Sequence, residues 1–378
     1  MNLHVTNDSY GLYPVEIAKR IKNSANSHNN CFVNLYKKSV HKDSIITYIP
    51  ETKIAFKNYI SKLVQLDKII FHPYNITAYR FLKITLKKFP DVKVYWMCWS
   101  YELYNLPHLT LDLYEPFSAT YLKKKWFSSR LIKASFKKYF NRLLITSGIK
   151  KDYKTALQHS HSLVHYFCSP FYSDFLFLQT VTPGNNIKYL PIAYLSLNNI
   201  ISNLDTDVSK GNKIMIGHSA SPDGNHYEII QKLNSINPEY HILLPLSYGD
   251  REYAGIIKRE AQQRFINVEI LEKKIERDSY YKKLTEVGWV IINAKVQQAV
   301  GNIIALIWMG AKLFLDKNVS TYKDFSSWGI DVFTIQDDLN EYELSNKLSF
   351  EQREKNRKKI LEKFNEETVI KAWNEFLY

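Results

Sequence analysis

The feature of this sequence that most constrains its fold is a repeated alternation of short apolar runs with amphipathic segments. In the first half, apolar runs at 67–72 and 92–99 end abruptly in polar residues. In the second half, runs at 213–216, 241–245 and 289–293 are each followed by a polar loop and then a segment of helical spacing. Strands joined by helices run parallel and carry helices on both faces of the sheet. We therefore predict an α/β fold of two Rossmann-like domains with a cleft between them.

The chain is long enough for two domains, since 378 residues exceed the usual size of one hydrophobic core. The stretch 198–212 is rich in Asn, Asp and Ser and is the best candidate for a linker. It separates an N-terminal domain at 1–197 from a C-terminal domain at 213–345. Residues 346–378 have a helical pattern, and we expect these helices to return to the N-terminal domain.

Charge divides the chain in the same way. The whole sequence has a net charge of +14, but residues 1–200 carry 27 Lys and Arg against 11 Asp and Glu, a balance of +16. The remaining residues have a balance of −2. The basic half is expected to face an anionic partner, for which nucleic acid, an acidic membrane surface and an anionic acceptor are the candidates.

The densest basic segment is 116–151, which contains no acidic residue and has aromatic and aliphatic residues at helical spacing. A basic amphipathic helix of this kind can lie among lipid headgroups. The residues expected to touch the membrane are Lys123, Lys124, Lys125, Trp126, Phe127 and Arg130. The alternative is that the apolar stripe is core and the lysines form a solvated rim. Nucleic acid is not expected, because no helix-turn-helix, RNP-like or zinc-finger pattern is present.

Cysteine and histidine spacing gives no sign of a disulfide framework or a metal site. Cys31, Cys98 and Cys168 are far apart and odd in number. His161 and His165 are four residues apart, but no carboxylate with matching spacing accompanies them. We also find no secretory signal pattern and no apolar run of the roughly 18 residues that span a membrane. We expect a soluble or peripheral protein in a reducing cytosol.

Three loops at the predicted carboxyl ends of the second sheet carry glycine, hydroxyl and amide residues. Such loops converge at one edge of a parallel sheet, where glycine allows close backbone approach and helix N-termini attract phosphate. The candidate donor-binding residues are Gly217, His218, Ser219, Ser247, Tyr248, Gln297, Gln298, Gly301 and Asn302. We predict a nucleotide-sugar site here. The alternative is a set of ordinary loops that only turn the chain.

The phosphate-binding fingerprints of other enzyme classes are absent from the sequence. It contains neither GxGxxG nor GxxxxGK[ST], which argues against a nicotinamide enzyme and a P-loop ATPase. No cofactor is expected, and no metal ion, because backbone N–H groups and helix dipoles can stabilise a departing diphosphate.

A glycosyl transfer to a hydroxyl group needs a general base within hydrogen-bond reach of that hydroxyl. The strand ends of the first domain offer Glu102, Asp8 and His72. We rank Glu102 first, because it follows an apolar strand and because Trp99 and Tyr101 can raise its pKa by desolvation. The alternative is that Glu102 is a surface carboxylate or a structural anchor.

Five segments resemble a known family. They are WMCWSYELY at 96–104, IMIGHSAS at 214–221, LLPLSYG at 243–249, EKKIERDSYYKKL at 272–284 and INAKVQQAVGNIIALIWMGAKLFL at 292–315. Together they look like the bacterial TDP-N-acetylfucosamine:lipid II N-acetylfucosaminyltransferases of enterobacterial common antigen synthesis, a 4-alpha-L-fucosyltransferase family.

The resemblance implies a GT-B glycosyltransferase fold, a TDP-sugar donor, and a polyprenyl-diphosphate-linked saccharide acceptor at the cytoplasmic face of the inner membrane. Family-type positions are Glu102, Gly217, Ser219, Tyr248, Asp278, Tyr280, Gln297, Gln298 and Gly301. The first loop departs from the family pattern at His218 and Pro222. An enzyme of O-antigen or capsule synthesis that uses another nucleotide sugar is therefore an alternative. A non-catalytic protein that binds nucleotide sugars or membrane surfaces is another.

Overall fold

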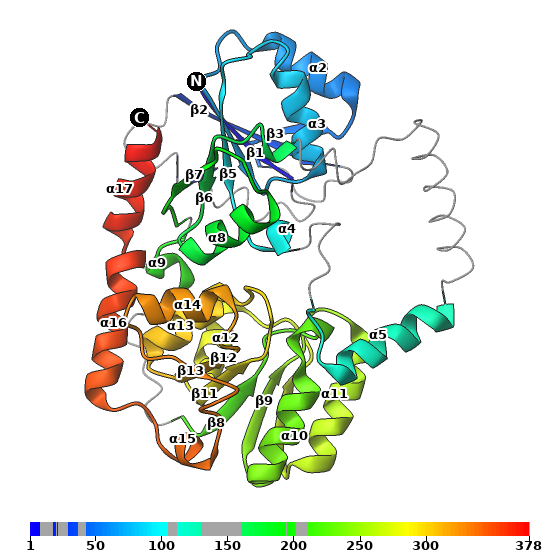
Figure 1. Ribbon diagram of the computed structural model, residues 1–378, viewed down its shortest axis with the longest axis vertical. Coiled ribbons are helices and arrows are strands. Elements are labelled where there is room, and N and C mark those ends of the chain that lie inside the picture. The colour runs from blue at the N-terminus through cyan, green and yellow to red at the C-terminus, as the bar shows by residue number, and fades with distance from the viewer. Residues whose placement is uncertain are drawn as a thin grey trace. The chain divides into compact units, whose positions relative to one another are not determined.

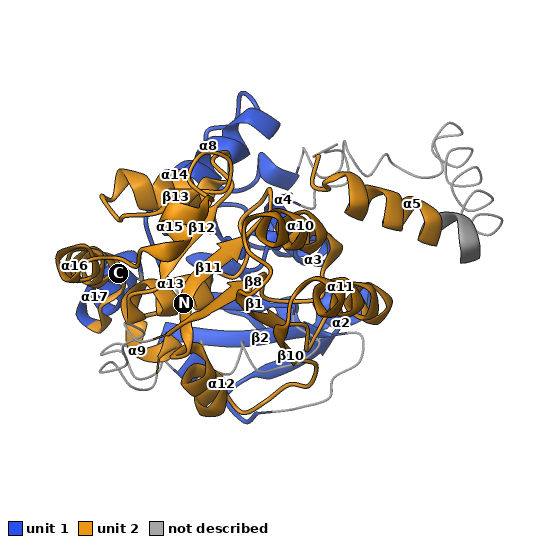
Figure 2. Ribbon diagram, turned by 90° about the horizontal axis from the view of Figure 1, so that it is seen from below, with its two compact units in different colours: residues 1–109, 151–194, 367–378 blue, residues 110–150, 195–366 orange. Residues whose placement is uncertain are grey.

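The computed structural model describes residues 1–7, 18, 19, 21, 29–36, 43–104, 112–129, 160–193, 195–201 and 211–377. The chain forms two compact units, which are coloured separately in Figure 2. Unit 1 consists of residues 1–109, 151–194 and 367–378, and unit 2 of residues 110–150 and 195–366. Each unit is thus assembled from segments that are far apart in the sequence.

Unit 1 contains a seven-stranded parallel sheet in the order β3-β2-β1-β4-β5-β6-β7 (Figure 1). Its strands are β1 (Asn2–Thr6), β2 (Asn30–Tyr36), β3 (Thr47–Pro50), β4 (Lys68–His72), β5 (Lys93–Met97), β6 (Tyr166–Cys168) and β7 (Lys188–Leu190). Its helices are α2 (Lys53–Lys62), α3 (Ile76–Thr85), α4 (Tyr101–Tyr104), α8 (Tyr172–Val181) and α17 (Glu366–Leu377). Ile69, Phe71 and Trp96 on the central strands are fully buried. Such continuous apolar strands are typical of a parallel sheet that is covered on both faces.

Unit 2 contains a six-stranded parallel sheet in the order β10-β9-β8-β11-β12-β13. Its strands are β8 (Lys213–Ile216), β9 (His241–Pro245), β10 (Asn267–Leu271), β11 (Val287–Ile292), β12 (Lys312–Leu315) and β13 (Phe333–Thr334). Its helices are α5 (Pro116–Ser129), α9 (Leu197–Ile200), η2 (Pro222–Gly224), α10 (His226–Ile236), α11 (Arg251–Arg264), α12 (Arg277–Leu284), α13 (Val300–Met309), α14 (Ser320–Ser327), α15 (Glu341–Ser345) and α16 (Phe350–Phe364). The two parallel sheets confirm the predicted α/β class.

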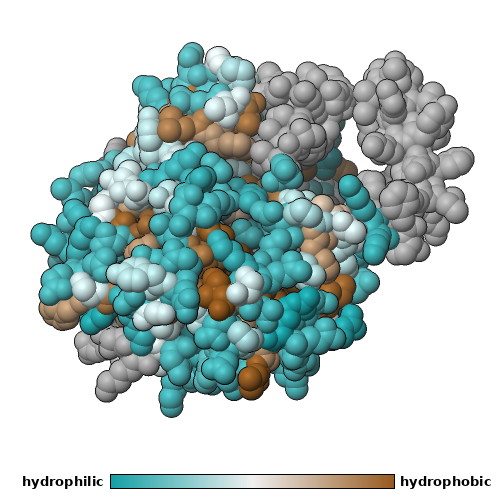
Figure 3. Space-filling model, turned by 60° about the horizontal axis from the view of Figure 1, so that its bottom comes forward, coloured by the Kyte–Doolittle hydropathy of each residue, from teal (hydrophilic) through white to brown (hydrophobic). Residues whose placement is uncertain are grey.

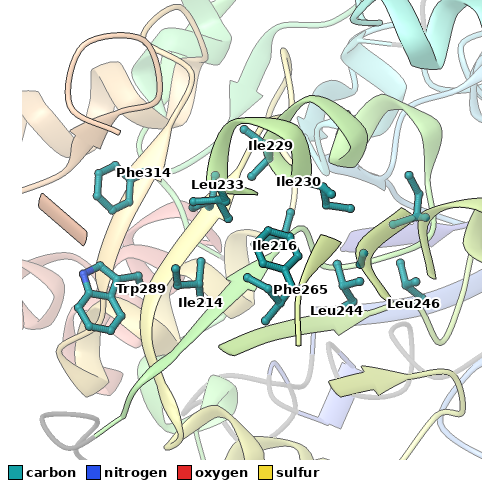
Figure 4. Packing of buried hydrophobic residues seen from close by; sticks show 14 of the residues in the cluster. Ile214, Ile216, Ile229, Ile230, Leu233, Leu244, Leu246, Phe265, Trp289 and Phe314 are labelled. Carbon is teal, nitrogen blue, oxygen red and sulfur yellow. The ribbon is translucent and has the colours of Figure 1, made fainter. Parts of the chain in front are cut away.

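The core of unit 2 fixes the strands that carry the candidate site. Ile229, Ile230 and Leu233 of α10 face Ile214 and Ile216 of β8 (Figure 4). All five side chains are almost completely buried. Full burial of each such side chain contributes about 1.5–3 kcal/mol relative to exposure. The strand ends and helix starts at this edge of the sheet are therefore held by tightly packed elements.

The start of the basic segment belongs to unit 2, although we expected it in the N-terminal domain. Phe117 of α5 stacks on Tyr227 of α10, with ring centroids 3.9 Å apart. The backbone N–H of Phe117 donates to Glu228, and Ser118 Oγ lies 3.2 Å from Tyr253 Oη. The sequence shows the helical period of α5 but not the helix on which its apolar face packs.

The boundaries of the two units also differ from the predicted domain boundaries at two other places. The second segment of unit 2 begins at residue 195 rather than after a linker, because α9 packs with unit 2 and buries Leu197 and Ile200. Residues 202–210 of the expected linker lie outside the described residues. Within the predicted returning segment, α16 packs against α13 of unit 2, and only residues 367–378 belong to unit 1.

The surface shown in Figure 3 is mostly hydrophilic, with apolar side chains scattered over it. In the described part of the chain, no helix has the length and apolar character needed to cross a bilayer.

Candidate functional site

The loops after β8 and β9 are joined to each other by backbone hydrogen bonds. Ala220 N donates to Tyr248 O over 2.7 Å, and Asp250 N donates to Ala220 O over 3.0 Å. Gly249 has a φ of 115°, and a Cβ there would lie 2.7 Å from the Ala220 carbonyl carbon. Glycine is required at this position because both the backbone conformation and the close approach exclude a side chain. The two loops are thereby fixed side by side.

The chain leaves β8 through Gly217, whose φ is 69°. Its N–H continues the sheet by donating to Ile291 O over 2.9 Å. A Cβ at Gly217 would lie 2.1 Å from Nε2 of His226, so the imidazole occupies the space beside the glycine. Ser219, further along the loop, is buried. The packing of His226 beside the loop thus accounts for the glycine at position 217 without any ligand.

Four of the predicted donor-binding residues, from four different elements, lie close together. The rings of His218 and Tyr248 meet edge to face with centroids 6.1 Å apart. Tyr248 is also an electrostatic neighbour of Tyr280 on α12, and Asn302 Nδ2 on α13 donates to Tyr280 Oη over 3.1 Å. Tyr248 is 58% exposed. These four side chains are called the donor cluster below.

The two strongly shifted groups of the donor cluster carry no charge near neutral pH. Burial lowers the pKa of His218 from 6.5 to about 4, although the nearby Asp223 carboxylate opposes the shift. Burial also raises the pKa of the Tyr280 hydroxyl. His218 and Tyr280 are therefore neutral hydrogen-bonding groups.

Gln298 and Gln297 follow β11 and lie beside the loop of β8. Gln298 Nε2 donates to Asp223 Oδ2 over 2.7 Å. Asp223 Oδ1 and Gln297 Nε2 are buried and have no hydrogen-bond partner among the described residues. Buried polar atoms are usually paired, so both point to a ligand or an ordered water at this edge.

The N-terminus of α13 opens onto the same loop. Ala299 precedes the helix with a φ of 58°, and no side chain caps the first N–H groups. The second helical residue is Gly301, and a Cβ built on it would meet no atom within 4 Å. Unpaired N–H groups at a helix start favour an anion through hydrogen bonds and the helix dipole. The arrangement can hold a diphosphate.

A half-buried lysine lies near this edge but is already neutralised. Lys295 Nζ forms ion pairs with Asp316, at 2.8 Å, and with Glu115. Gln336 Nε2 also donates to Asp316 over 2.7 Å. The carboxylates hold the pKa of Lys295 above its usual value even though burial opposes this. Lys295 is therefore committed to the structure rather than free to bind phosphate.

Asn225 connects the segments around the site. It is fully buried, and its Nδ2 donates to the carbonyl oxygens of Leu113 and Asn293, each over 3.0 Å. Its Oδ1 accepts from Glu115 N over 2.8 Å. The sequence analysis missed Asn225 and Asp223. The available signal was the turn-forming Asp-Gly-Asn triplet directly before the predicted helix.

Two further predicted residues lie on elements that also carry members of the donor cluster. Ser247 is half-buried in the loop after β9. Asp278 is exposed in the first turn of α12, two residues before Tyr280. The assignment of these two residues to donor binding stays a prediction.

Glu102 in unit 1 is buried at the turn between β5 and α4. Its Oε1 accepts hydrogen bonds from Trp96 Nε1 over 2.9 Å and from Trp99 N over 2.8 Å. Its Oε2 is buried and has no partner among the described residues. Burial raises the pKa of this carboxyl from 4.5 to about 7, against the effect of the two hydrogen bonds. Glu102 is thus both an anchor of its turn and a group able to exchange a proton near neutral pH.

The other two candidate bases are not supported. His72 is completely buried, with Nε2 3.1 Å from His4 Nδ1 and its ring stacked on Trp373 of α17. The second nitrogen of His4 lies 3.2 Å from Asn30 Oδ1. Since no face of His72 is open to an acceptor hydroxyl, we withdraw it as a base. Asp8 lies outside the described residues.

The histidines that are close in sequence have structural surroundings. His161 is buried and stacks on Trp96 with ring centroids 5.4 Å apart. His165 Nδ1 accepts from Val94 N over 3.1 Å. Within the described residues, no group of three or more His, Cys, Asp or Glu side chains is arranged to hold a metal ion.

The predicted membrane residues on α5 have different surroundings. Lys123 and Lys124 are exposed. Lys125 forms an ion pair with Asp250 and lies over the Tyr121 ring, 5.5 Å from its centroid, so it is not free for lipid. The side chains of Trp126 and Phe127, and Arg130 as a whole, lie outside the described residues. Membrane contact through this segment stays a prediction.

Comparison with solved structures identifies the fold. A lipopolysaccharide outer core galactosyltransferase, WaaB, is 12% identical with a TM-score of 0.63, over 100% of this chain and 99% of that one. HepE from Anabaena, solved in complex with UDP-glucose, is 10% identical with a TM-score of 0.62, over 100% and 99% of the two chains. The N-terminal domain of a trehalose-6-phosphate phosphatase from Candida albicans is 12% identical with a TM-score of 0.64, over 100% and 95%. The fold is GT-B, as predicted.

Comparison at the level of sequence identifies the family. No curated protein sequence matches this chain. The sequence profile described as 4-alpha-L-fucosyltransferase, glycosyl transferase group 56, matches residues 172–377. That range includes all four residues of the donor cluster and confirms the resemblance seen in the motifs. The chain therefore belongs to the 4-alpha-L-fucosyltransferase family, glycosyl transferase group 56, and is a glycosyltransferase.

Proposed function

We propose that this enzyme transfers a deoxyamino sugar similar to N-acetylfucosamine from a TDP-sugar to a polyprenyl-diphosphate-linked saccharide. The observation that carries the proposal is the donor cluster of His218, Tyr248, Tyr280 and Asn302, which is formed by two strand-end loops and by helices α12 and α13, together with the uncapped N-terminus of α13. The family supports a fucose-type sugar. A nucleotide-sugar donor is supported by HepE, which was solved with UDP and with UDP-glucose.

The diphosphate of the donor is assigned to the N-terminus of α13. There the backbone N–H groups and the amide of Gln298 can donate to phosphate oxygens, and the helix dipole stabilises negative charge as it develops on the leaving group. Tyr248 offers its exposed ring for stacking on the base or the sugar. We propose that no metal ion or cofactor takes part.

Proton transfer from the acceptor is assigned to Glu102 of unit 1. Its carboxylate takes the proton of the acceptor hydroxyl while that oxygen bonds to the anomeric carbon of the sugar. The bond from this carbon to the diphosphate oxygen breaks at the same time, and TDP leaves with the electron pair. A buried carboxyl whose pKa is near 7 suits this role, because it is a stronger base than an ordinary glutamate.

A lipid-linked acceptor requires the enzyme to act at a membrane surface. We propose that the enzyme associates peripherally with the cytoplasmic face of the inner membrane and uses the basic charge of residues 1–200 to do so. Turnover should therefore require a polyprenyl-diphosphate-linked saccharide in vesicles or detergent. Equal turnover on the free saccharide would contradict the proposed acceptor.

The donor site can be tested with a matched pair of glycine variants, Gly301→Ala and Gly255→Ala. Both glycines lie in helices, and a Cβ at either one meets no atom within 4 Å, so both variants should fold. If the diphosphate lies against the start of α13, the methyl group of Gly301→Ala enters its space. We expect about tenfold or greater loss of TDP affinity for Gly301→Ala and no change for Gly255→Ala.

The measurement is isothermal titration calorimetry with TDP, UDP, GDP and their sugars in buffer containing EDTA. Tightest binding of the TDP compounds in EDTA supports both the donor and its independence of metal. Binding that appears only after Mn²⁺ or Mg²⁺ is added would contradict the metal-free site. Tighter binding of the UDP compounds would indicate another nucleotide sugar as the donor. Equal TDP affinity of the two alanine variants would contradict the placement of the diphosphate at the N-terminus of α13.

A further inference from the structure

A pocket in unit 1, far along the chain from the donor cluster, has the composition of an anion-binding site. It has a volume of about 480 Å³ and is lined by Glu51, Lys53, Phe56, Arg80, Lys83, Ile84 and Lys87. All of these residues belong to α2, α3 or the residues beside them. The volume lies within the usual range for small-molecule sites. We call it the α2–α3 pocket.

The two helices that form the α2–α3 pocket are held in fixed positions. They pack against each other through Phe56 and Phe81, whose rings meet edge to face with centroids 5.1 Å apart. Thr52 caps α2 by accepting from Ala55 N over 3.2 Å, and Asn75 caps α3 by accepting from Thr77 N and Ala78 N. The pocket walls are therefore parts of two stable helices, not of a loose loop.

Positive charge dominates the walls. Arg80, Lys83 and Lys87 follow one another at spacings of three and four residues along α3 and just past its end, and Lys53 comes from the first turn of α2. Residues at this spacing lie on one face of a helix. The four cations share the pocket with a single carboxylate, that of Glu51.

Glu51 can balance at most one of the four cations, Arg80. Its carboxylate accepts a hydrogen bond from Thr77 Oγ1, and its side chain is only 8% exposed. Arg80 Nη1 lies 3.8 Å away and remains 64% exposed. Among the described residues, Lys53, Lys83 and Lys87 have no carboxylate partner. At least three positive charges therefore remain available to a ligand in a small space.

The floor of the α2–α3 pocket is apolar. Phe56 is 2% exposed and Ile84 is half-buried, and both line the cavity. Next to Lys53, Ile54 is 73% exposed in the first turn of α2. A solvated basic face that served only for solubility would not need an apolar floor. Cations around apolar surface suit a ligand with a phosphate group and an apolar portion.

We infer that the α2–α3 pocket binds a phosphate-bearing anion, with the lysines and Arg80 around the phosphate and Phe56 and Ile84 against the apolar portion. The site is independent of the donor cluster, which lies in unit 2, and the inference does not depend on the proposed substrates. The phosphate can belong to a lipid headgroup or to a soluble phosphate compound, since both present the same charged oxygens.

The test compares the full-length variant Lys83→Gln/Lys87→Gln with Lys57→Gln/Lys62→Gln. Both pairs remove two positive charges from exposed positions of α2 or α3 and their ends, but Lys57 and Lys62 do not line the pocket. One arm titrates inorganic pyrophosphate by calorimetry in the presence of saturating TDP. The other arm floats the protein with vesicles of phosphatidylcholine containing phosphatidylglycerol, and with pure phosphatidylcholine vesicles.

We expect the pocket variant to lose about tenfold or more of its affinity in at least one arm, and the matched variant to stay close to the parent protein. Loss in the pyrophosphate arm identifies a soluble ligand, whereas loss confined to phosphatidylglycerol vesicles identifies a lipid headgroup. Equal losses in both variants would show a general charge effect and overturn the site. Failure of the parent protein to bind both pyrophosphate and the phosphatidylglycerol vesicles would overturn it as well. Urea unfolding curves that match that of the parent protein show that each variant is folded.

Discussion

The two oxygens of Glu102 have different surroundings, and this difference makes the residue testable. Oε1 is held by Trp96 and Trp99, whereas Oε2 has no partner among the described residues. Glu102→Gln keeps an oxygen that can accept both hydrogen bonds but cannot take a proton. If Glu102 is the base, turnover should fall by about a hundredfold or more while TDP binding is unchanged.

The pH dependence of turnover is a second test of Glu102. A base must be deprotonated, so kcat/KM should rise with pH and level off above the pKa of Glu102, which burial raises to about 7. The pH–rate profile of the parent enzyme measures this rise in kcat/KM. Full turnover of Glu102→Gln, or a profile that is flat between pH 6 and 8, would show that Glu102 is only a structural anchor.

Buried histidines predict that unit 1 loses stability in mild acid. Burial lowers the pKa of His4 from 6.5 to about 4 and places that of His72 well below 6.5. The unfolded chain therefore binds protons that the folded chain cannot, and the free energy of unfolding falls as pH drops below about 6.5. At pH 5 the burial of His4 alone should cost about 2 kcal/mol, and that of His72 acts in the same direction.

This prediction is measured by urea unfolding of the parent and of His4→Gln at pH 7.5 and pH 5. The variant removes one titrating group, so its loss of stability between the two pH values should be smaller. The same loss in both proteins would assign the acid sensitivity to other groups, such as His226 of unit 2, whose pKa burial lowers to about 3.

At the scale of elements, the feature that shapes the donor site is the backbone bridge that Ala220 forms with Tyr248 and Asp250. Gly249→Ala places a methyl group 2.7 Å from the Ala220 carbonyl carbon at a φ of 115°. We expect a loss of about 1–3 kcal/mol from backbone strain, with a further loss from the clash, and weaker TDP binding because Tyr248 moves with the loop. Urea unfolding and calorimetry measure the two effects. If Gly249→Ala keeps the stability and TDP affinity of the parent, the bridge has no role in the site.

The sequence was most informative where a strand is buried on both faces. The predicted strands at 213–216 and 241–245 coincide with β8 and β9, because apolar runs bounded by polar loops leave few other interpretations. It was least informative for α5, whose apolar stripe fits a lipid surface and a protein core equally well. The contacts of Phe117 with Tyr227 and Glu228, and of Ser118 with Tyr253, show that its first turn packs on unit 2.

Part of the candidate site could also be predicted from the sequence. Strand-end position identified His218, Tyr248 and Asn302, since parallel topology brings such residues to one edge. Tyr280 came only from the family resemblance, because it lies inside α12 rather than at a strand end. The role of Asn225 depends on Leu113 and Asn293, which are remote in sequence, so no local pattern reveals it.

At the scale of the whole molecule, the unusual feature of unit 1 is that α17 completes it. Trp373 stacks on His72 and donates its Nε1 hydrogen to Ala193 O over 2.9 Å, while Phe376 meets Tyr95 edge to face. Protein synthesis proceeds from the amino to the carboxyl end, so the strands of unit 1 leave the ribosome long before this helix does. The pair of His4 and His72 therefore lacks the cover of Trp373 until all of unit 2 has been synthesised, and the packing of unit 1 can be completed only after that point.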